Sequence, residues 1–361
     1  MAQNMNGLSL ELIIHPGETL REILEDRKMS QKELAARVGL TEAYISNVIN
    51  GQKAISVSLA KKLEYALGID ASFWINLQAN YDKELADFED FNRISQEEVN
   101  ILKRLTHIIE YLKELGFLEL EAHGAILVVQ LRKLLNVSNL TQIPAVSQTG
   151  AYRLATAVNV DPFVLFTWLR MCDLLMESQQ IEQKLDIDQL KRKIPRIKEL
   201  MFASFAEIQV RLTALLAECG IKFAIVKHFR GAPVQGLIKK NNDDSLSLIM
   251  TNRHKFADVF WFTFFHEIGH IINGDVDDRL IDYDDLINSD AEDKADDFAA
   301  NTLITPERYA EFVHKGNYSL THIKLFCAEE NIPPFILIGR LHKERRLPYN
   351  HYSSEKIKYE L

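Results

Sequence analysis

The chain has 361 residues, of which 47% are hydrophobic and 26% charged. At about 150 residues per domain, this length predicts two or three domains and excludes a single small module, and the apolar content is sufficient for their cores. It contains no run of about 18 apolar residues and no basic leader before an apolar stretch, which excludes a membrane protein and predicts a cytoplasmic one. The net charge is −9, and the segment from Asp275 to Asp297, with eleven acids and two bases, accounts for all of it. The rest of the chain is neutral, so charge alone does not exclude nucleic acid.

Residues 11 to 82 carry five short helical patterns. Ser30 and Glu33 form a capping box that opens the second helix, and Gly39 ends it. Thr41 caps a third helix that ends at Gly51, and the last two helices cover 56–67 and 71–81. This segment is therefore predicted to be entirely helical.

The second and third helices have the spacing of a helix-turn-helix. A small Ala35 allows a close helix crossing, Gly39 makes the tight turn, and Ile45 and Val48 attach the second helix to the core. A polar face remains for base edges, with Lys53 placed for phosphate. The candidate DNA-binding residues are Gln31, Thr41, Glu42, Ala43, Ser46, Asn47, Asn50 and Lys53. The alternative is an ordinary helical bundle whose polar face is only solvated.

Residues 1 to 80 hold eight bases and nine acids, so one copy would bind DNA weakly and a dimer on two half-sites is expected. The segments IHPGETLREIL, SQKELAARVGLTEAYISNVINGQKAIS and LAKKLEYALGIDASFWINLQANYD resemble the XRE-type domain of HigA antitoxins. This resemblance covers about 70 residues. It implies a homodimeric repressor fold that binds double-stranded operator DNA.

Residues 83–94 are charged and poor in aliphatic residues, which predicts a linker between an N-terminal domain of residues 1–82 and a helical middle region of residues 95–219. The sequence pattern changes from helical to β-like at Gly220. Three short β-like runs, IKFAIVKHF, GLIKK and SLSLIMT, are separated by turn residues and predict a small sheet. A long helix over 254–272, an acidic stretch expected to be a solvated loop or a flexible flap, and further helices follow. Residues 220–361 are thus predicted to form an α+β domain in a mainly helical, multidomain chain.

The string His266-Glu267-Ile268-Gly269-His270 lies in that long helix. Residues four apart share one helix face, so both imidazoles can bind one zinc ion while Glu267 takes a proton from water. The helix is apolar nearly all round and hence buried, and buried histidines need partners. The alternative is a hydrogen-bonded polar cluster without metal.

A catalytic zinc site needs a third protein ligand. Glu292, 22 residues past His270, is the candidate, although Ser289 and Glu292 also form a capping box that would give Glu292 an ordinary role at a helix start. Spacing alone leaves both roles open.

The segments TNRHKFADVFWFTFFHEIGHIINGD and AEDKADDFAANTLITP resemble the ImmA/IrrE family of zinc peptidases, which have HExxH followed by ExxA[ND]xFA. The resemblance implies His266, His270 and Glu292 as zinc ligands, Glu267 as general base, and Asp296 as the partner that orients one ligand histidine. Asp296 stands where asparagine is common, and the insert before Glu292 is rich in aspartate. Asp290 or Asp293 could therefore compete as the ligand.

Two functions follow as hypotheses. In the first, the protein is a DNA-binding regulator whose peptidase domain cleaves a regulatory protein: an XRE-type repressor, a toxin partner or itself. In the second, it is a HigA-like antitoxin or repressor of a toxin-antitoxin system, whose zinc domain is structural or sensory and has no turnover. Glu267 favours the first, because a structural zinc needs no base.

Overall fold

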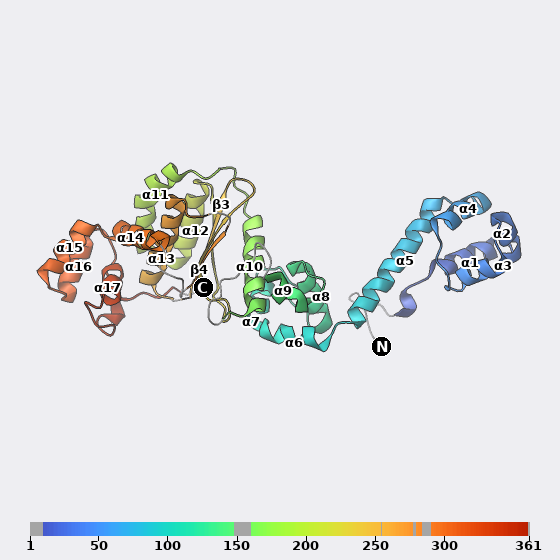
Figure 1. The fold of residues 1–361 in the computed structure, drawn as a ribbon, viewed down its shortest axis with the longest axis horizontal. Helices are drawn as coiled ribbons and strands as arrows, with labels where there is room; N and C mark the ends of the chain where they lie inside the picture. Colours follow the sequence, from blue (N-terminus) through green and yellow to red (C-terminus); the bar gives the residue numbers. More distant parts are fainter. Residues whose placement is uncertain (1–9, 148–159, 254, 277–278, 284–289, 360–361) are drawn as a thin grey trace. The chain divides into compact units, whose positions relative to one another are not determined.

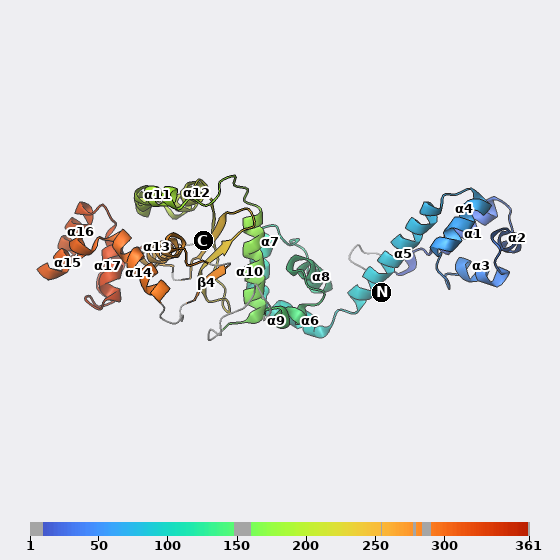
Figure 2. The same ribbon diagram turned by 45° about the horizontal axis from the view of Figure 1, so that its top comes forward.

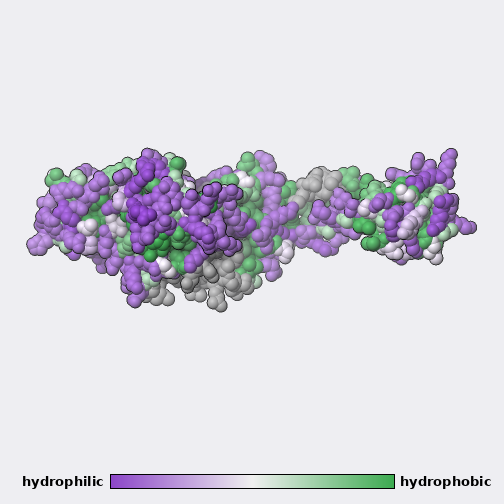
Figure 3. All heavy atoms as spheres, turned by 90° about the horizontal axis from the view of Figure 1, so that it is seen from above, coloured by the Kyte–Doolittle hydropathy of each residue, from purple (hydrophilic) through white to green (hydrophobic). Residues whose placement is uncertain are grey.

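The structure, a computed structural model, describes residues 10–147, 160–253, 255–276, 279–283 and 290–359 (Figure 1). The chain divides into two compact units, one of residues up to Leu102 with Leu118–Lys133, the other of Lys103–Phe117 with Leu134–Leu361. The predicted fold class is confirmed: the chain is mainly helical, with a small sheet in its C-terminal part. No described helix is long and apolar enough to cross a membrane. Hydrophilic residues cover much of the face shown in Figure 3.

Five helices form the N-terminal bundle, as predicted: α1 Pro16–Asp26, α2 Gln31–Val38, α3 Glu42–Ile49, α4 Val57–Leu67 and α5 Ala71–Asn92. Ser30 caps α2 by accepting a hydrogen bond from the Glu33 amide at 3.1 Å. Gly39 then adopts φ 64°, a left-handed conformation that suits glycine and turns the chain into α3. Leu34, Ile45 and Trp74 are completely buried in the core of the bundle.

Residues 83–94, which were predicted to be a linker, are helical over most of their length, because α5 continues to Asn92. Its charged residues pair within the helix, as in the contact of Arg93 with Glu89 at 2.8 Å. The end of α5 is also tied to the next helices. Arg132 contacts Asp90 at 2.8 Å and the buried Glu98 at 2.7 Å.

Over its described residues, the middle region is mainly helical, as predicted. Its helices are α6 Gln96–Arg104, α7 Thr106–Glu114, α8 Gly124–Leu135, α9 Ile143–Ser147, α10 Pro162–Glu177, α11 Ile187–Glu199 and α12 Phe205–Ala217. Helix α10 is buried over most of its length. Asp161 caps this helix through a hydrogen bond from the Phe163 amide at 3.0 Å.

The sheet has the order β1-β3-β2-β4, with β1 Ile221–Val226, β2 Val234–Lys240, β3 Leu246–Thr251 and β4 Arg279–Tyr283. β1 and β3 are parallel, and β2 runs antiparallel to both β3 and β4. Three strands were predicted. The fourth, β4, lies in the acidic stretch, which was expected to be a loop or flap and is instead paired with β2 over these residues.

The sheet has helices on both faces (Figure 2). On one face, alternate residues such as Phe223 and its β3 partner Leu248 join the main core with α11, α12 and α13. On the other face, Lys239 of β2 contacts Asp173 of α10 at 2.6 Å. The remaining helices are α13 Ala257–Asn273, α14 Asp290–Leu303, α15 Pro306–Lys315, α16 Leu320–Glu329 and α17 Pro334–Lys343. Helix α13, which carries the HExxH string, packs against α14 and against β2.

Candidate functional site

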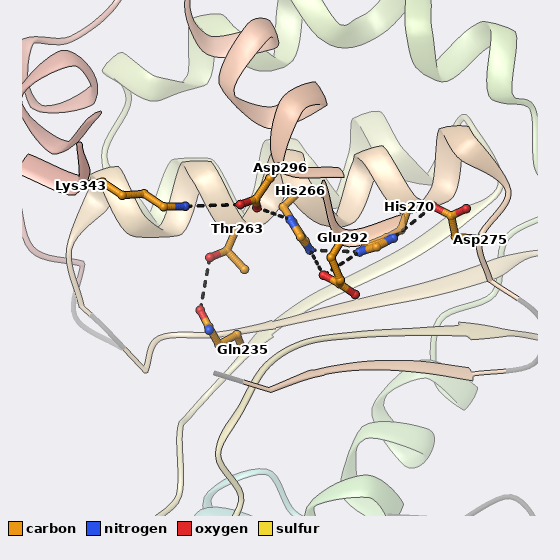
Figure 4. A network of polar contacts seen from close by, with 8 residues as sticks. All are labelled: Gln235, Thr263, His266, His270, Asp275, Glu292, Asp296 and Lys343. Carbon is orange, nitrogen blue, oxygen red and sulfur yellow. Dashed lines mark hydrogen bonds and ion pairs between the residues drawn. The ribbon is translucent and has the colours of Figure 1, made fainter. Parts of the chain in front are cut away.

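Two neighbouring helices bring three metal-binding side chains together (Figure 4). His266 and His270 lie one turn apart on α13, and their Nε2 atoms are 3.0 Å from each other. Glu292, in the first turn of α14, places Oε2 3.1 Å from His266 Nε2 and 3.5 Å from His270 Nε2. Among the described residues, this is the one group of three such side chains close enough to share an ion.

The opposite nitrogen of each ring faces a carboxylate. His266 Nδ1 lies 2.9 Å from Asp296 Oδ1, and His270 Nδ1 lies 3.2 Å from Asp275 Oδ2. A carboxylate is an acceptor, so each Nδ1 carries the proton and donates it, which leaves both Nε2 lone pairs directed at the centre. Burial alone would raise the pKa of Asp296, but the hydrogen bond from His266 and the charge of Lys343 hold that pKa below its ordinary value.

This donor set fits a zinc ion. Two imidazole nitrogens and a carboxylate oxygen converge within 3.5 Å, and a cation bound between them would stabilise this arrangement of three acceptors. Zinc binds such atoms at about 2.0–2.1 Å in tetrahedral geometry, which separates ligand atoms by about 3.3 Å. The three separations found here, 3.0, 3.1 and 3.5 Å, lie around that value.

Small residues allow α14 to approach α13 closely enough to deliver Glu292. A Cβ on Gly269 would lie 3.1 Å from the Cα of Ala295, so even an alanine there would press on the facing helix. Ala295 and Ala299 are completely buried along the same contact. The candidate ligand is therefore positioned by helix packing.

Glu267 is completely buried and faces the sheet. A Cβ built on Gly236 of β2 would lie 1.8 Å from Glu267 Oε1, so the strand has room for this carboxylate only because residue 236 is glycine. The pairing of β2 with β4 shifts register at the same place, between Val234 and Gly236. The strand is thus adapted locally to the glutamate of the HExxH string.

The two alternative ligands, Asp290 and Asp293, are exposed and do not belong to the metal-binding group. The predicted capping role of Glu292 depends on Ser289, which lies outside the described residues. Sequence reasoning missed Asp275 and Gly236. Asp275 directly follows the glycine that ends α13, a position from which a side chain can fold back, whereas the role of Gly236 depends on strand pairing that no local pattern reveals.

The predicted DNA-binding residues gather on and around α3. Thr41 is its N-cap and accepts a hydrogen bond from the Tyr44 amide at 3.2 Å, and Asn50 is its C-cap. Gln31 is the first residue of α2. Thr41, Glu42, Ala43, Asn47, Asn50 and Lys53 are exposed, and Gln31 and Ser46 are half-buried. The Lys53 ammonium lies 4.1 Å from the centre of the Tyr44 ring, a cation–π contact beside the helix.

Comparison with known proteins matches two segments of the chain to families. Residues 20–74 match the helix-turn-helix family model, and residues 233–330 match the IrrE N-terminal-like domain. Antitoxin HigA-1 of Vibrio cholerae is 36% identical over 90 residues, which are 25% of this chain and 80% of that protein. The chain belongs to the HigA-like helix-turn-helix family. It differs from that relative in carrying the IrrE-like domain after its HigA-like domain.

Other relatives match the HigA-like domain as well. Virulence-associated protein I of Dichelobacter nodosus is 35% identical over 75 residues, or 20% of this chain and 69% of that protein. A solved addiction module antidote protein of the HigA family from Coxiella burnetii is 30% identical and covers 27% of this chain and 91% of its own, with a TM-score of 0.20.

Proposed function

We propose that the protein is a DNA-binding regulator that hydrolyses peptide bonds in a regulatory partner protein, or in itself, at a zinc centre held by His266, His270 and Glu292. The observation that carries the peptidase proposal is the convergence of two imidazole lone pairs and one carboxylate beside a buried glutamate, in a domain of the IrrE-like family. When bound there, zinc supplies Lewis-acid activation of water and of the scissile carbonyl.

The side chains around the centre take the remaining roles. Asp296 and Asp275 hold the two imidazoles with Nε2 inward, through their contacts with the Nδ1 atoms. Glu267 acts as general base, taking the proton from the attacking water and passing it to the leaving amine. Gly236 keeps the space in which the Glu267 carboxylate lies.

The test is to compare the native protein with Glu267→Gln and Glu292→Gln, measuring zinc content and cleavage of co-expressed partner proteins. Glu267→Gln should keep its zinc and lose cleavage by about 100-fold or more, because only the base is removed. Glu292→Gln should lose zinc as well. Stoichiometric zinc without cleavage by the native protein would instead favour the antitoxin or repressor whose zinc domain is structural or sensory.

For the HigA-like domain, we propose a homodimer that binds double-stranded operator DNA through α3. The helix presents Asn47 and Asn50 on an exposed face, and asparagine can read base edges. In a gel-shift assay on DNA from the protein's own promoter, Asn47→Ala should weaken binding by about 5- to 100-fold. Asn100→Ala, on an exposed face of α6, serves as the control. Equal binding by both variants would refute the role of α3.

A further inference from the structure

Helix α17 packs along α13, the helix that carries both candidate histidine ligands. A Cβ built on Gly339 of α17 would lie 2.4 Å from Asp258 Oδ2 of α13, so the two helices approach closely there. One turn further along α17, the Lys343 ammonium lies 4.0 Å from the centre of the Phe262 ring. Asp258, Phe262 and His266 follow one another at intervals of four residues. One face of α13 therefore leads from the contact with α17 to the metal-binding group.

Lys343 contacts the carboxylate that holds His266. Its Nζ lies 3.6 Å from Asp296 Oδ2, while Asp296 Oδ1 lies 2.9 Å from His266 Nδ1 (Figure 4). The Asp296 side chain is 51% exposed, so without the lysine water would compete for Oδ2. A carboxylate held at both oxygens has fewer orientations than one held at a single oxygen, and the lysine therefore limits the rotation of Asp296.

Contacts of α17 with both helices of the metal-binding group place Lys343. The Phe262 ring of α13 attracts its ammonium through a cation–π contact. One turn earlier in α17, Arg340 Nη1 donates to the carbonyls of Ala300 and Ile304, at 3.3 and 3.5 Å, at the end of α14. Helix α17 is thus attached to α14 as well as to α13.

We propose that Lys343 is a positioning residue of the candidate zinc centre, which holds Asp296 in the orientation that directs His266 Nε2 at the metal. The proposal rests on the zinc centre of the function proposed above. A direct effect of the lysine charge on zinc has the opposite sign, because two cations repel each other. Salt screens an exposed ammonium that is separated from the metal by Asp296 and by the His266 ring, so this repulsion is small. Loss of the lysine should therefore weaken zinc binding.

Competition titration of the full-length protein with a chelating dye measures zinc affinity and requires no turnover. Lys343→Met keeps an unbranched side chain over Phe262 and removes the charge, and it should weaken zinc binding by about three- to ten-fold. Lys343→Arg keeps a cation and should bind zinc within about two-fold of the native affinity. Lys315→Met is the control, because it removes an exposed lysine that pairs with Glu311 within α15, and it should leave zinc affinity unchanged.

A double-mutant cycle separates positioning from packing. In protein that already carries Asp296→Asn, the atom facing the lysine is an amide nitrogen, which does not attract an ammonium. Lys343→Met should then change zinc affinity by less than about two-fold. Lys343→Gln repeats the cycle if thermal melting shows that Lys343→Met is destabilised.

An equal loss of affinity in both backgrounds would mean that Lys343 acts through the packing of α17, and it would overturn the proposal. Native affinity or tighter zinc binding in Lys343→Met would overturn it as well. Failure of the proposed function gives a different result. Zinc binding that depends on Lys343 without any cleavage refutes the peptidase and leaves the positioning role, whereas a native protein that binds no zinc refutes both.

Discussion

At the scale of single residues, the space around Glu267 depends on Gly236. The Gly236→Ala Cβ would occupy the position of Glu267 Oε1, and a buried helix packed between β2 and α14 has little freedom to retreat. We expect Gly236→Ala to lower peptide hydrolysis by about 100-fold while zinc content stays unchanged. Zinc analysis and cleavage assays measure both. Lys240→Ala, an exposed change at the end of the same strand, should leave both unaltered.

Asp275 is a second residue whose substitution should affect mainly the metal centre. Its backbone amide donates to the His270 carbonyl at 3.1 Å, and its carboxylate contacts His270 Nδ1, so the turn after α13 holds it in place. Asp275→Asn should weaken zinc affinity by about 10- to 100-fold in a competition titration with a chelating dye. The exposed Asp293→Asn is the control. A change as large in that control would revive Asp293 as the competing ligand.

At the scale of elements, a buried ion pair joins α6 to α8. Glu98 is completely buried, and Arg132 donates to both of its carboxylate oxygens, at 2.9 and 2.7 Å. The hydrogen bonds to Glu98 are the largest cause of the raised pKa of Arg132. Arg132→Ala leaves a buried carboxylate without its guanidinium, which typically costs about 3–5 kcal/mol.

Calorimetry of the full chain should show this as a loss of thermal stability in the transition that contains α6 and α8. Arg93→Ala removes only an exposed pair with Glu89 and should cost less than about 1 kcal/mol. If the two variants have the same melting temperature, the contacts of Arg132 do not stabilise the fold.

Some of the secondary-structure elements could be predicted from the sequence and others could not. The helix starts at Ser30 and Thr41 and the one-turn spacing of His266 and His270 were predicted because capping and helical periodicity are local properties. Residues 83–92 were not predicted to be helical because they are poor in aliphatic residues, although ion pairs such as that of Arg93 with Glu89 stabilise the helix. The strand β4 and the contact of Gly236 with Glu267 arise from pairing between distant segments, which no local pattern encodes.

At the scale of the whole molecule, the chain carries two different chemistries on separate cores. The HigA-like bundle encloses its own apolar core and has α3 at its surface, while the sheet and α13 share another core that holds the candidate metal centre. The central claim is that His266, His270 and Glu292 bind one zinc ion. Every proposed role of Glu267, Asp275 and Asp296 depends on it.

Zinc K-edge X-ray absorption on the full-length protein, together with its metal content, tests this claim most directly. We predict one zinc per chain, bound by two imidazole nitrogens and by oxygen at about 2.0–2.1 Å, and loss of that signal in His266→Ala and Glu292→Gln. A native protein without stoichiometric zinc, or a spectrum that both variants leave unchanged, would contradict it.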